Sequence, residues 1–366
     1  TKHRMRRLRL LVLVADGPGN ATLSYQHGWP RHLSRDPRYE CTLVNLLDRS
    51  WSARLRRASL RWGRFDAILL LHSVFSNACS LTGWAFDAVR LNRAPKVFFI
   101  GNEYKLMPEK MTFCDGLGVR LLITQSHSPR VHSLYRERLG CLVAGIPNTG
   151  WDPEIFRPER PRADRSLDLG YRSLVSPLYL GHNERVEMLE VFREAARRHG
   201  LSADLSLSAA DRLDERGWAA FLNSCRGQIG TEAGGDYFEL TDATRQLVNA
   251  YLEGHPEASI EDVRRGFFRD YPDPVPIRIL SSRNIEAAAT RTVQLLLEGE
   301  YGGYFQSGVH YIGVRHDYSN VDDAIRQFKD PQLSEEIADR AYRLVNEQLT
   351  FDRLLDRFHA TLRPLV

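Results

Sequence analysis

Short, continuous apolar runs separated by longer mixed stretches open the chain. Residues 8–15 read LRLLVLVA and end at the break Asp16-Gly17-Pro18-Gly19-Asn20. An uninterrupted apolar run of this length predicts a strand buried on both faces, as in a parallel sheet. Similar runs alternate with helix-like stretches, the runs at 41–47, 67–71, 96–100 and 121–124 and the helix-like stretches at 21–33, 80–91 and 129–139. This alternation predicts an α/β fold with a doubly wound parallel sheet.

A proline-containing segment then interrupts the pattern. Residues 147–158 carry three prolines, and residues 159–165 are charged, which is typical of an interdomain linker. The alternation resumes after it, with strands expected at 203–207, 227–231 and 293–297 and helices expected at 184–199, 217–223, 242–253, 259–268, 334–347 and 351–362. The pattern therefore predicts two α/β halves that match in architecture and not in sequence.

Length and composition agree with a two-domain globular protein. The 366 residues exceed one ordinary core, so two domains of about 150–200 residues are expected. Hydrophobic residues make up 43% and charged residues 26% of the chain, and no apolar run approaches the ~20 residues of a membrane span. The five cysteines lack metal-type spacing, and the start of the chain does not have the pattern of a secretory signal. A cytoplasmic protein with free thiols is expected.

The charge of the chain is modest, with one basic cluster at its start. The formal net charge is +4, and the cluster comprises Lys2, Arg4, Arg6, Arg7 and Arg9. Such a cluster can attract anionic lipid at the inner face of a membrane, or it can be a solvated leader before the first strand. Nucleic acid is not an expected partner, because the rest of the chain is not strongly basic.

The segment 277–320 carries the most specific chemistry. Arg283 and Glu286 stand at the beginning of a helix of small residues, directly before the apolar strand at 293–297. A helix N-terminus favours a diphosphate, an arginine can bind that diphosphate with two hydrogen bonds, and a carboxylate can accept from ribose hydroxyls. The segment therefore predicts half of a nucleotide-sugar site.

Several strings of the sequence resemble a known enzyme family. The linker resembles the PNGVD…F.P segment of the group 1 (retaining, GT-B) glycosyltransferases, and Glu286-Ala287-Ala288 resembles the end of the E-x7-E motif of that family. The chain is more closely similar to a bacterial group of glycosyltransferase-like proteins in the strings FIGNEYK (99–105), DLGYR (168–172), GTEAG (230–234), SRNIEAAA (282–289), EGEYGG (298–303) and HYIGVRHDYSN (310–320). These strings extend over more than half of the chain.

The resemblance implies a GT-B fold of two Rossmann-like domains facing a cleft. It implies an N-terminal acceptor-binding domain at 1–158, a C-terminal nucleotide-sugar-binding domain at 159–350, and a helix at 351–366 that crosses back to the first domain. The implied reaction transfers a sugar from a nucleoside-diphosphate sugar to an acceptor hydroxyl with retention. No cofactor is implied beyond the donor, and no acid pair suggests a metal. A sugar-containing or lipid-linked acceptor, or a small metabolite, is expected.

The donor-binding candidates lie in the second half. They are Arg172, Arg283, Asn284, Glu286, Tyr301 and Gly302, with Arg185 as a weaker one. The chain departs from the E-x7-E motif at Arg278, where the family has the first glutamate, the acid that meets the sugar. We predict that Glu232 takes over from that missing acid as a catalytic residue.

The remaining candidates follow strands of the first half, where parallel sheets bind ligands. His72 and Glu103 are predicted catalytic residues, His72 as a general base and Glu103 as a group that orients the acceptor. Gly17, Gly19 and Asn102 are predicted to bind the acceptor. For each of these residues a structural role, such as a turn, a cap or a buried histidine, stays open.

Two other function classes also stay open at this point. A sugar-nucleotide epimerase of the same architecture would use acids and histidines such as His72, Glu103 and Glu232 around the sugar. A non-catalytic module would bind the nucleotide sugar without turnover, and the arginine at position 278 agrees with that class. Release of nucleoside diphosphate only in the presence of an acceptor distinguishes the transferase from both.

Overall fold

The computed structural model describes residues 6–18, 23–50 and 56–366, which divide into two compact units. Unit 1 comprises the chain up to Thr149, residues 239–242 and Phe351–Val366, and unit 2 comprises Gly150–Phe238 and Ala243–Thr350. The basic residues Lys2 and Arg4 and the acceptor candidate Gly19 lie outside the described residues, and the predictions about them stay predictions.

Within the described ranges, unit 1 contains a six-stranded parallel sheet. Its order is β2-β1-β3-β4-β5-β6, from Tyr39–Asn45, Leu8–Val14, Ala67–Leu70, Lys96–Phe99, Val119–Thr124 and Leu142–Gly145. Most central positions of these strands are fully buried, because helices cover both faces and each strand needs apolar side chains on both sides.

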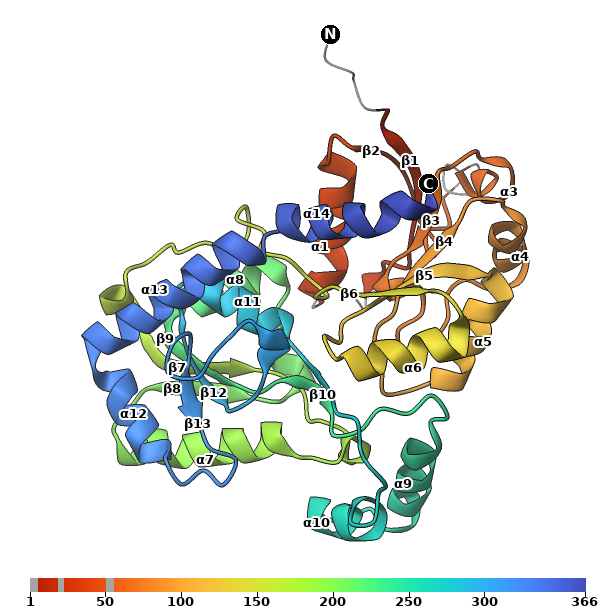
Figure 1. Cartoon of the computed structure of the whole chain (residues 1–366). Coiled ribbons are helices and arrows are strands. Elements are labelled where there is room, and N and C mark those ends of the chain that lie inside the picture. The colour runs from red at the N-terminus through yellow and green to blue at the C-terminus, as the bar shows by residue number, and fades with distance from the viewer. Residues whose placement is uncertain (1–5, 19–22, 51–55) are drawn as a thin grey trace. The chain divides into compact units, whose positions relative to one another are not determined.

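Helices cover both faces of this sheet, as two neighbouring rings of β4 demonstrate (Figure 1). Phe98 points to one face and packs on Phe113 of α5 (Met107–Leu117), with ring centroids 5.3 Å apart. Phe99 points to the other face and packs on Trp29 of α1 (Ser24–Arg35) at 5.0 Å. Alternation along the strand therefore fixes the two helical layers. The remaining helices of the unit include α4 (Gly83–Leu91) and α6 (Pro129–Leu139).

The last helix, α14 (Phe351–Leu362), belongs to unit 1. Its Phe358 packs on Phe99 at 5.4 Å, and its Phe351 stacks on His32 of α1 at 4.2 Å. Gly28 makes this approach possible, because a Cβ there would collide with the ring of Phe351. The apolar stripe of α14 is thus buried against the same sheet face as α1.

The described part of unit 2 contains a five-stranded parallel sheet of order β13-β12-β9-β7-β8. The strands are Ile312–Val314, Val293–Leu297, Cys225–Gly230, Leu167–Arg172 and Ala203–Ser206. Figure 1 shows α7 (Glu184–Arg198) and α12 (Val321–Lys329) on one side of this sheet. It shows α8 (Glu215–Ser224), α11 (Ser282–Ala289) and α13 (Pro331–Gln348) on the other. The core between the layers includes Phe192, Ile229, Leu295 and Phe328.

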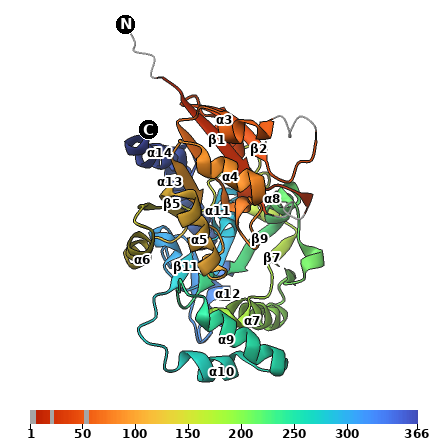
Figure 2. The ribbon, with the colours of Figure 1, turned by 90° about the vertical axis from the view of Figure 1, so that its right-hand side faces the viewer.

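An insertion interrupts unit 2 between two short antiparallel strands, β10 (Ala233–Gly235) and β11 (Ile277–Ile279). It contains α9 (Ala243–Gly254), α10 (Ile260–Val263) and the π-helical turn η6 (Arg264–Phe268). Figures 1 and 2 show α9 and α10 side by side beyond the parallel sheet, and both contact η4 (Leu178–Leu180), which precedes α7.

Arg165 fixes the position of α11. Its buried guanidinium donates to the carbonyl of Thr290, directly after α11, and to the carbonyls of Leu222 and Cys225 at the end of α8. A cation at a helix C-terminus interacts favourably with the helix dipole, and one arginine here serves two helices. Arg165 therefore fixes the C-terminal end of α11, the helix whose first turns carry Arg283 and Glu286.

The predicted α/β architecture with two parallel sheets is confirmed. The elements that were not predicted include the helix α5, the strand β6 and the ribbon β10–β11, and the helix expected at 259–268 is an α-helical turn followed by the π-helical turn. None of the helices in the described ranges has both the length and the apolar character needed to cross a lipid bilayer.

Candidate donor and acceptor sites

The carboxyl ends of the strands in unit 2 meet at one edge, and several predicted residues follow them. Arg172 ends β7, Glu232 follows β9, and Tyr301 and Gly302 follow β12. Arg283 and Glu286 lie in the first turns of α11, the helix that precedes β12. The structure therefore brings most of the predicted donor residues into one part of unit 2.

Glu286 is buried and held in a defined orientation. Its side chain is 3% exposed, and its Oε2 accepts a hydrogen bond of 2.7 Å from Nε1 of Trp218 on α8. A buried indole N–H requires an acceptor, and a hydrogen bond to a charged group is among the stronger ones. Trp218 thus positions the carboxylate that we predict to bind ribose.

Arg283 lies in a strongly basic environment. Burial, together with the charges of Arg185 and Arg212, lowers the pKa of Arg283 to about 10, against the opposite effect of Tyr171 and Glu286. Three guanidiniums that repel one another in a half-buried place cost stability. An anion bound among them would remove that cost, and a diphosphate has the required charge and geometry.

The loop between β7 and α7 borders this basic group. Three of its buried side-chain atoms, Ser173 Oγ, Ser176 Oγ and Asn183 Oδ1, hydrogen-bond to no described group, and the same holds for Nε of Arg185 in the first turn of α7. Buried polar atoms are nearly always paired in proteins, and exceptions concentrate where a ligand or ion binds. Arg185 also donates from Nη1 to the carbonyl of Leu174 at 3.2 Å, which ties it to the loop. The loop is therefore suited to contact a polar ligand.

Arg172 is engaged within the fold. It donates to the carboxylate of Asp204 on β8 at 2.5 Å and to the carbonyls of Asp204 and Tyr171, and it stacks over the ring of Phe221 at 4.3 Å. A ligand of the site would have to compete with that ion pair. Asn284 is also engaged, since it caps α11 together with Ser281 and pairs with Gln294 of β12.

The capping changes the expected role of the α11 N-terminus. Ser281 Oγ accepts from the backbone N–H of Arg283, and Asn284 Oδ1 accepts from the backbone N–H of Ser281. These two N–H groups are already paired within the capping box. The guanidiniums, rather than the amides alone, supply the positive charge of the site.

Arg278, which stands where the resembling family has an acid, forms a buried ion-pair network. It donates to both carboxylate oxygens of Glu184 on α7, at 2.8 and 2.9 Å, and to Asp236 after β10. Burial raises the pKa of Glu184, but the hydrogen bonds and charge of Arg278 and the charge of His182 outweigh it and hold that pKa below its usual value. Nδ1 of His182 lies 3.7 Å from Glu184.

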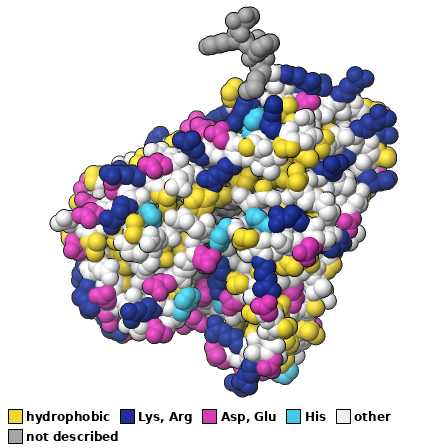
Figure 3. Space-filling view, viewed as in Figure 1, with side chains coloured by type: hydrophobic (Ala, Val, Ile, Leu, Met, Phe, Trp, Pro, Cys, Tyr) yellow, Lys and Arg dark blue, Asp and Glu magenta, His cyan; other side chains and the backbone are white. Residues whose placement is uncertain are grey.

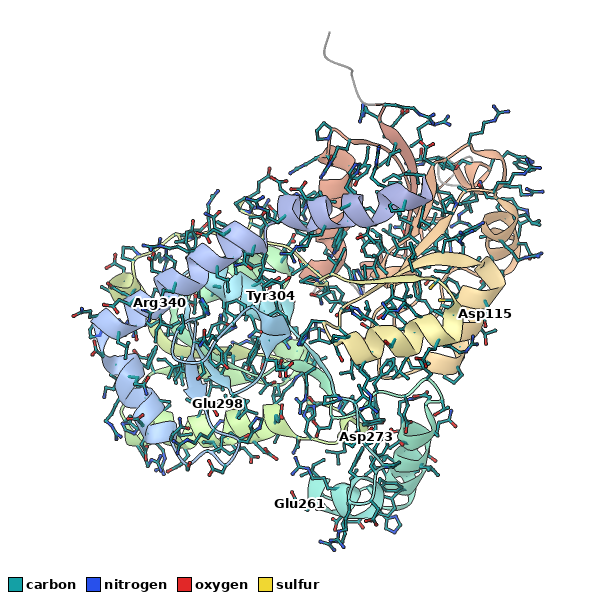
Figure 4. All side chains as sticks on the ribbon, in the orientation of Figure 1. Asp115, Glu261, Asp273, Glu298, Tyr304 and Arg340 are labelled. Carbon is teal, nitrogen blue, oxygen red and sulfur yellow. The ribbon has the colours of Figure 1, made fainter. Side chains whose placement is uncertain are left out.

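Glu232 connects the β9 end to the loop after β12. Its Oε1 accepts a 2.6 Å hydrogen bond from the backbone N–H of Tyr301, and burial raises the pKa of its carboxyl. Tyr301 is fully buried, and its hydroxyl donates to the carbonyl of Leu297. Gly302 has a φ of +67°, a conformation that favours glycine. Figure 4 labels Glu298 and Tyr304, which bound this loop.

In unit 1, Gly17, His72 and Asn102 lie at the carboxyl edge of the sheet, after the neighbouring strands β1, β3 and β4. His72 is 2% exposed, its Nε2 hydrogen-bonds to no described group, and burial lowers its pKa to about 3. A general base works best when its pKa is near the working pH. His72 in this environment stays neutral and is a weak base.

Glu103 points into the core of unit 1. It is 0% exposed and accepts hydrogen bonds from Thr124 Oγ1, the backbone N–H of Gln125 and the hydroxyl of Tyr135. Burial raises the pKa of its carboxyl. These three bonds join β5 and α6 to the loop after β4, which is a structural task.

Asn102 has a φ of +48° and donates to Ser76 and Asn77 at the same edge. Gly17 follows Asp16, which exchanges hydrogen bonds with Asn45 of β2. The structure therefore brings Gly17, His72 and Asn102 to one edge of unit 1 and turns Glu103 away from it.

The sequence analysis did not identify the residues that interact with Glu286, Arg278 and Arg283, namely Trp218, Glu184, Asp236 and Arg212. They come from segments far apart in the chain, and only Arg278, at the motif position, signalled a change there. Among the described residues, no group of three His, Cys, Asp or Glu side chains is arranged to hold a metal ion.

No protein-family model matches the sequence. The sequence also matches no curated protein. Solved structures, however, match over nearly the whole chain. HepE from Anabaena in complex with UDP-glucose is 12% identical, with 98% of this chain and 100% of that chain covered and a TM-score of 0.51. Sucrose-phosphate synthase from Thermosynechococcus elongatus is 9% identical, with 98% and 99% covered and a TM-score of 0.53. These similarities confirm the GT-B fold, with two Rossmann-like α/β units.

Proposed function

We propose that the chain is a GT-B glycosyltransferase that moves a sugar from a nucleoside-diphosphate sugar to an acceptor hydroxyl. One observation carries the proposal: Arg283, at the start of α11, experiences the charges of Arg185 and Arg212 and that of the buried carboxylate of Glu286. A cluster of guanidiniums fits a diphosphate, and a fixed carboxylate fits ribose hydroxyls.

The similar structures support the same assignment. HepE, which shares the fold, was solved in complexes with UDP-glucose and with UDP. Sucrose-phosphate synthase is an enzyme of the same fold. A UDP-sugar is therefore the first donor class to test for this chain.

The proposed chemistry requires no metal ion. As the bond between the sugar and the diphosphate breaks, negative charge accumulates on the diphosphate, and Arg283 with its neighbours stabilises that charge. Glu232 stands in for the sugar-contacting acid that is absent at position 278, and the reaction proceeds with retention. A sugar-containing, lipid-linked or small acceptor binds at the edge of unit 1 that carries Gly17 and Asn102. The reaction takes place in the cytoplasm.

A thermal-shift screen against UDP, GDP, ADP and dTDP and their glucose conjugates tests the donor site. A ligand at 100 times its dissociation constant stabilises the folded state by about 2.7 kcal/mol, which is a measurable shift. We expect one nucleotide to stabilise the protein and Arg283→Ala to weaken its binding by about 10- to 100-fold, because a charge-assisted hydrogen bond contributes about 1.5–3 kcal/mol.

Two controls make the screen specific. Arg197→Ala removes an exposed arginine at the other end of α7, whose guanidinium has Glu194 as its one partner among the described residues, and should leave the affinity unchanged. Trp218→Phe keeps an aromatic ring and removes the hydrogen bond to Glu286. It should therefore weaken the binding of a nucleotide and not that of inorganic pyrophosphate. Stabilisation by none of the four nucleotides would overturn the proposal, and binding without turnover across an acceptor panel would favour the non-catalytic module.

A further inference from the structure

Apart from the candidate donor site, unit 2 contains a pocket between the insertion and the segment that leads into α7. Its volume is about 530 Å³, and its lining includes Gly181, Asp236, Arg264, Phe268, Arg269 and Tyr271. Glu261, Arg265 and Pro274 complete the wall. Figure 4 labels Glu261 on α10 and Asp273 on the segment after η6, at the same end of the unit.

The charges that line this pocket do not balance. Asp236 is paired with Arg278, and Glu261 is paired with Arg264 at 2.9 Å. Arg265 and Arg269 are exposed, and their guanidiniums form no hydrogen bond or ion pair with any residue in the described ranges. Asp262, whose charge interacts with that of Arg265, is committed to the capping box at the start of α10. Two guanidiniums are therefore left for a ligand.

The π-helical turn η6 carries Arg264 and Arg265, and Arg269 follows it directly. The backbone N–H of Arg269 donates to the carbonyl of Arg264 at 2.9 Å, so the two residues lie one π turn apart, and both line the pocket. π turns are rare and occur frequently at functional sites. Arg264 is fixed from the other side, since its Nε donates to the carbonyl of Gly181 at 3.1 Å.

Aromatic rings form the other part of the lining. The rings of Phe268 and Tyr271 are stacked, with centroids 6.2 Å apart, and Tyr237 packs against both at 5.2 and 5.5 Å. Aromatic faces pack well against the C–H groups of sugar rings, and arginines bind carboxylate or phosphate groups with two hydrogen bonds. In Figure 3, hydrophobic and basic side chains lie next to one another at the lower end of the view, over α9 and α10.

The pocket adjoins the network at the motif position. Asp236 belongs both to the lining and to the ion pair with Arg278, and Gly181 directly precedes His182 of the same network. If the donor binds as proposed above, the sugar end of the donor site is on this side of unit 2. A ligand in the pocket would then lie beside the transferred sugar.

We propose that this pocket is a further acceptor subsite, additional to the one proposed at the edge of unit 1, for an anionic saccharide whose carboxylate or phosphate group binds Arg265 and Arg269 and whose ring packs on Phe268 and Tyr271. The role of the pocket as an acceptor subsite rests on the proposed function, whereas the binding of an anionic sugar rests on the pocket alone. Such a subsite would select an anionic acceptor over a neutral one.

Matched pairs of probes test it by NMR titration of the full chain. Cellobiouronic acid is compared with cellobiose, and glucose 6-phosphate with glucose. We expect the charged member of at least one pair to bind at least 10-fold more tightly than its neutral counterpart. Preference for the carboxylate pair, the phosphate pair or both names the anionic group, and equal binding of charged and neutral members in both pairs would overturn the proposal.

Variants assign the binding to this pocket. Arg265→Ala with Arg269→Ala should abolish the preference, because both side chains are exposed and their removal leaves the fold intact. Arg193→Ala with Arg197→Ala, the same loss of charge on α7, should not change it. A preference that survives the first pair of substitutions would refute the assignment.

Nucleotide binding separates this inference from the proposed function. The substitutions at 265 and 269 should leave the affinity for the stabilising nucleoside diphosphate within twofold. Binding of an anionic sugar without any nucleotide binding would refute the proposed glycosyltransferase function and support the proposed binding pocket. Nucleotide binding without the charge preference would do the reverse.

Discussion

Replacing Arg278 by alanine should destabilise unit 2 in a manner that depends on pH. The substitution removes three hydrogen bonds and leaves Glu184 without its cation. The side chains of Arg278 and Glu184 are 17% and 8% exposed, whereas that of Asp236 is 42% exposed. After the substitution, water can solvate the carboxylate of Asp236 but has little access to the carboxylate of Glu184.

The magnitude follows from this difference in burial. Breaking a buried ion pair by removing one partner costs about 3–5 kcal/mol, and a surface pair contributes about 0–1 kcal/mol. The pair with Glu184 is close to the buried case, so we expect a loss of about 3 kcal/mol at pH 7.5. Adding Glu184→Gln to the variant removes the uncompensated charge and should recover about half of the loss.

The pH dependence has a definite sign. In the native protein Arg278 holds the pKa of Glu184 below its unfolded value, so this stabilising contribution is present above about pH 4.3 and lost as the pH falls through the lowered pKa. In Arg278→Ala, burial is no longer opposed by Arg278 and raises the pKa of Glu184. The carboxyl then takes up a proton as the pH falls toward 5, and the stability deficit of the variant should shrink.

Urea denaturation at pH 7.5 and pH 5.0 measures these quantities for the protein, the single variant and the double variant. Arg343→Ala, which removes an exposed arginine of α13 paired with Asp339, serves as the control and should cost less than about 1 kcal/mol. A deficit below 1 kcal/mol for Arg278→Ala, or a deficit that grows at pH 5.0, would refute the reasoning.

Two further predictions concern unit 1. Phe358→Ala should lower the free energy of unfolding by about 3–5 kcal/mol in urea denaturation, because Phe358 is fully buried against Phe99, and a loss below 1 kcal/mol would contradict the packing described for α14. The ring of His72 should stay neutral down to about pH 3 in an NMR titration; because its pKa is lowered from 6.5, its contribution to stability is lost as the pH falls from 6.5 toward 3, and His72→Phe should remove that part of the acid sensitivity. A ring that titrates near pH 6.5 would contradict the burial.

The sequence was sufficient for the architecture because parallel strands that are buried on both faces leave continuous apolar runs. Leu8–Val14 and Val293–Leu297 are such runs, and both are strands where they were predicted. The strand β6 was not predicted although its residues are apolar, because the run is short and leads directly into the proline-containing segment that was interpreted as a linker.

The candidate site was predictable only in part. Residues at strand ends and at the start of α11 could be named from the order of elements, and the structure places Arg283, Glu286 and Glu232 in unit 2 as that order implies. Whether a side chain faces a ligand or the core depends on partners that are distant in the chain. Glu103 illustrates this, since Thr124 and Tyr135 bind it in the interior.

The division of the chain into units has a practical consequence for protein engineering. Unit 1 is discontinuous, because it takes its last helix from Phe351–Val366, after unit 2 has been completed. A fragment that ends at Thr149 would expose the apolar surfaces of Trp29, Tyr39 and Phe99 that α14 covers, and such a fragment invites aggregation. An isolated unit 1 would need residues 351–366 joined to its end by a flexible linker. A truncation at the C-terminus of the chain would therefore destabilise the sheet formed by the N-terminal part.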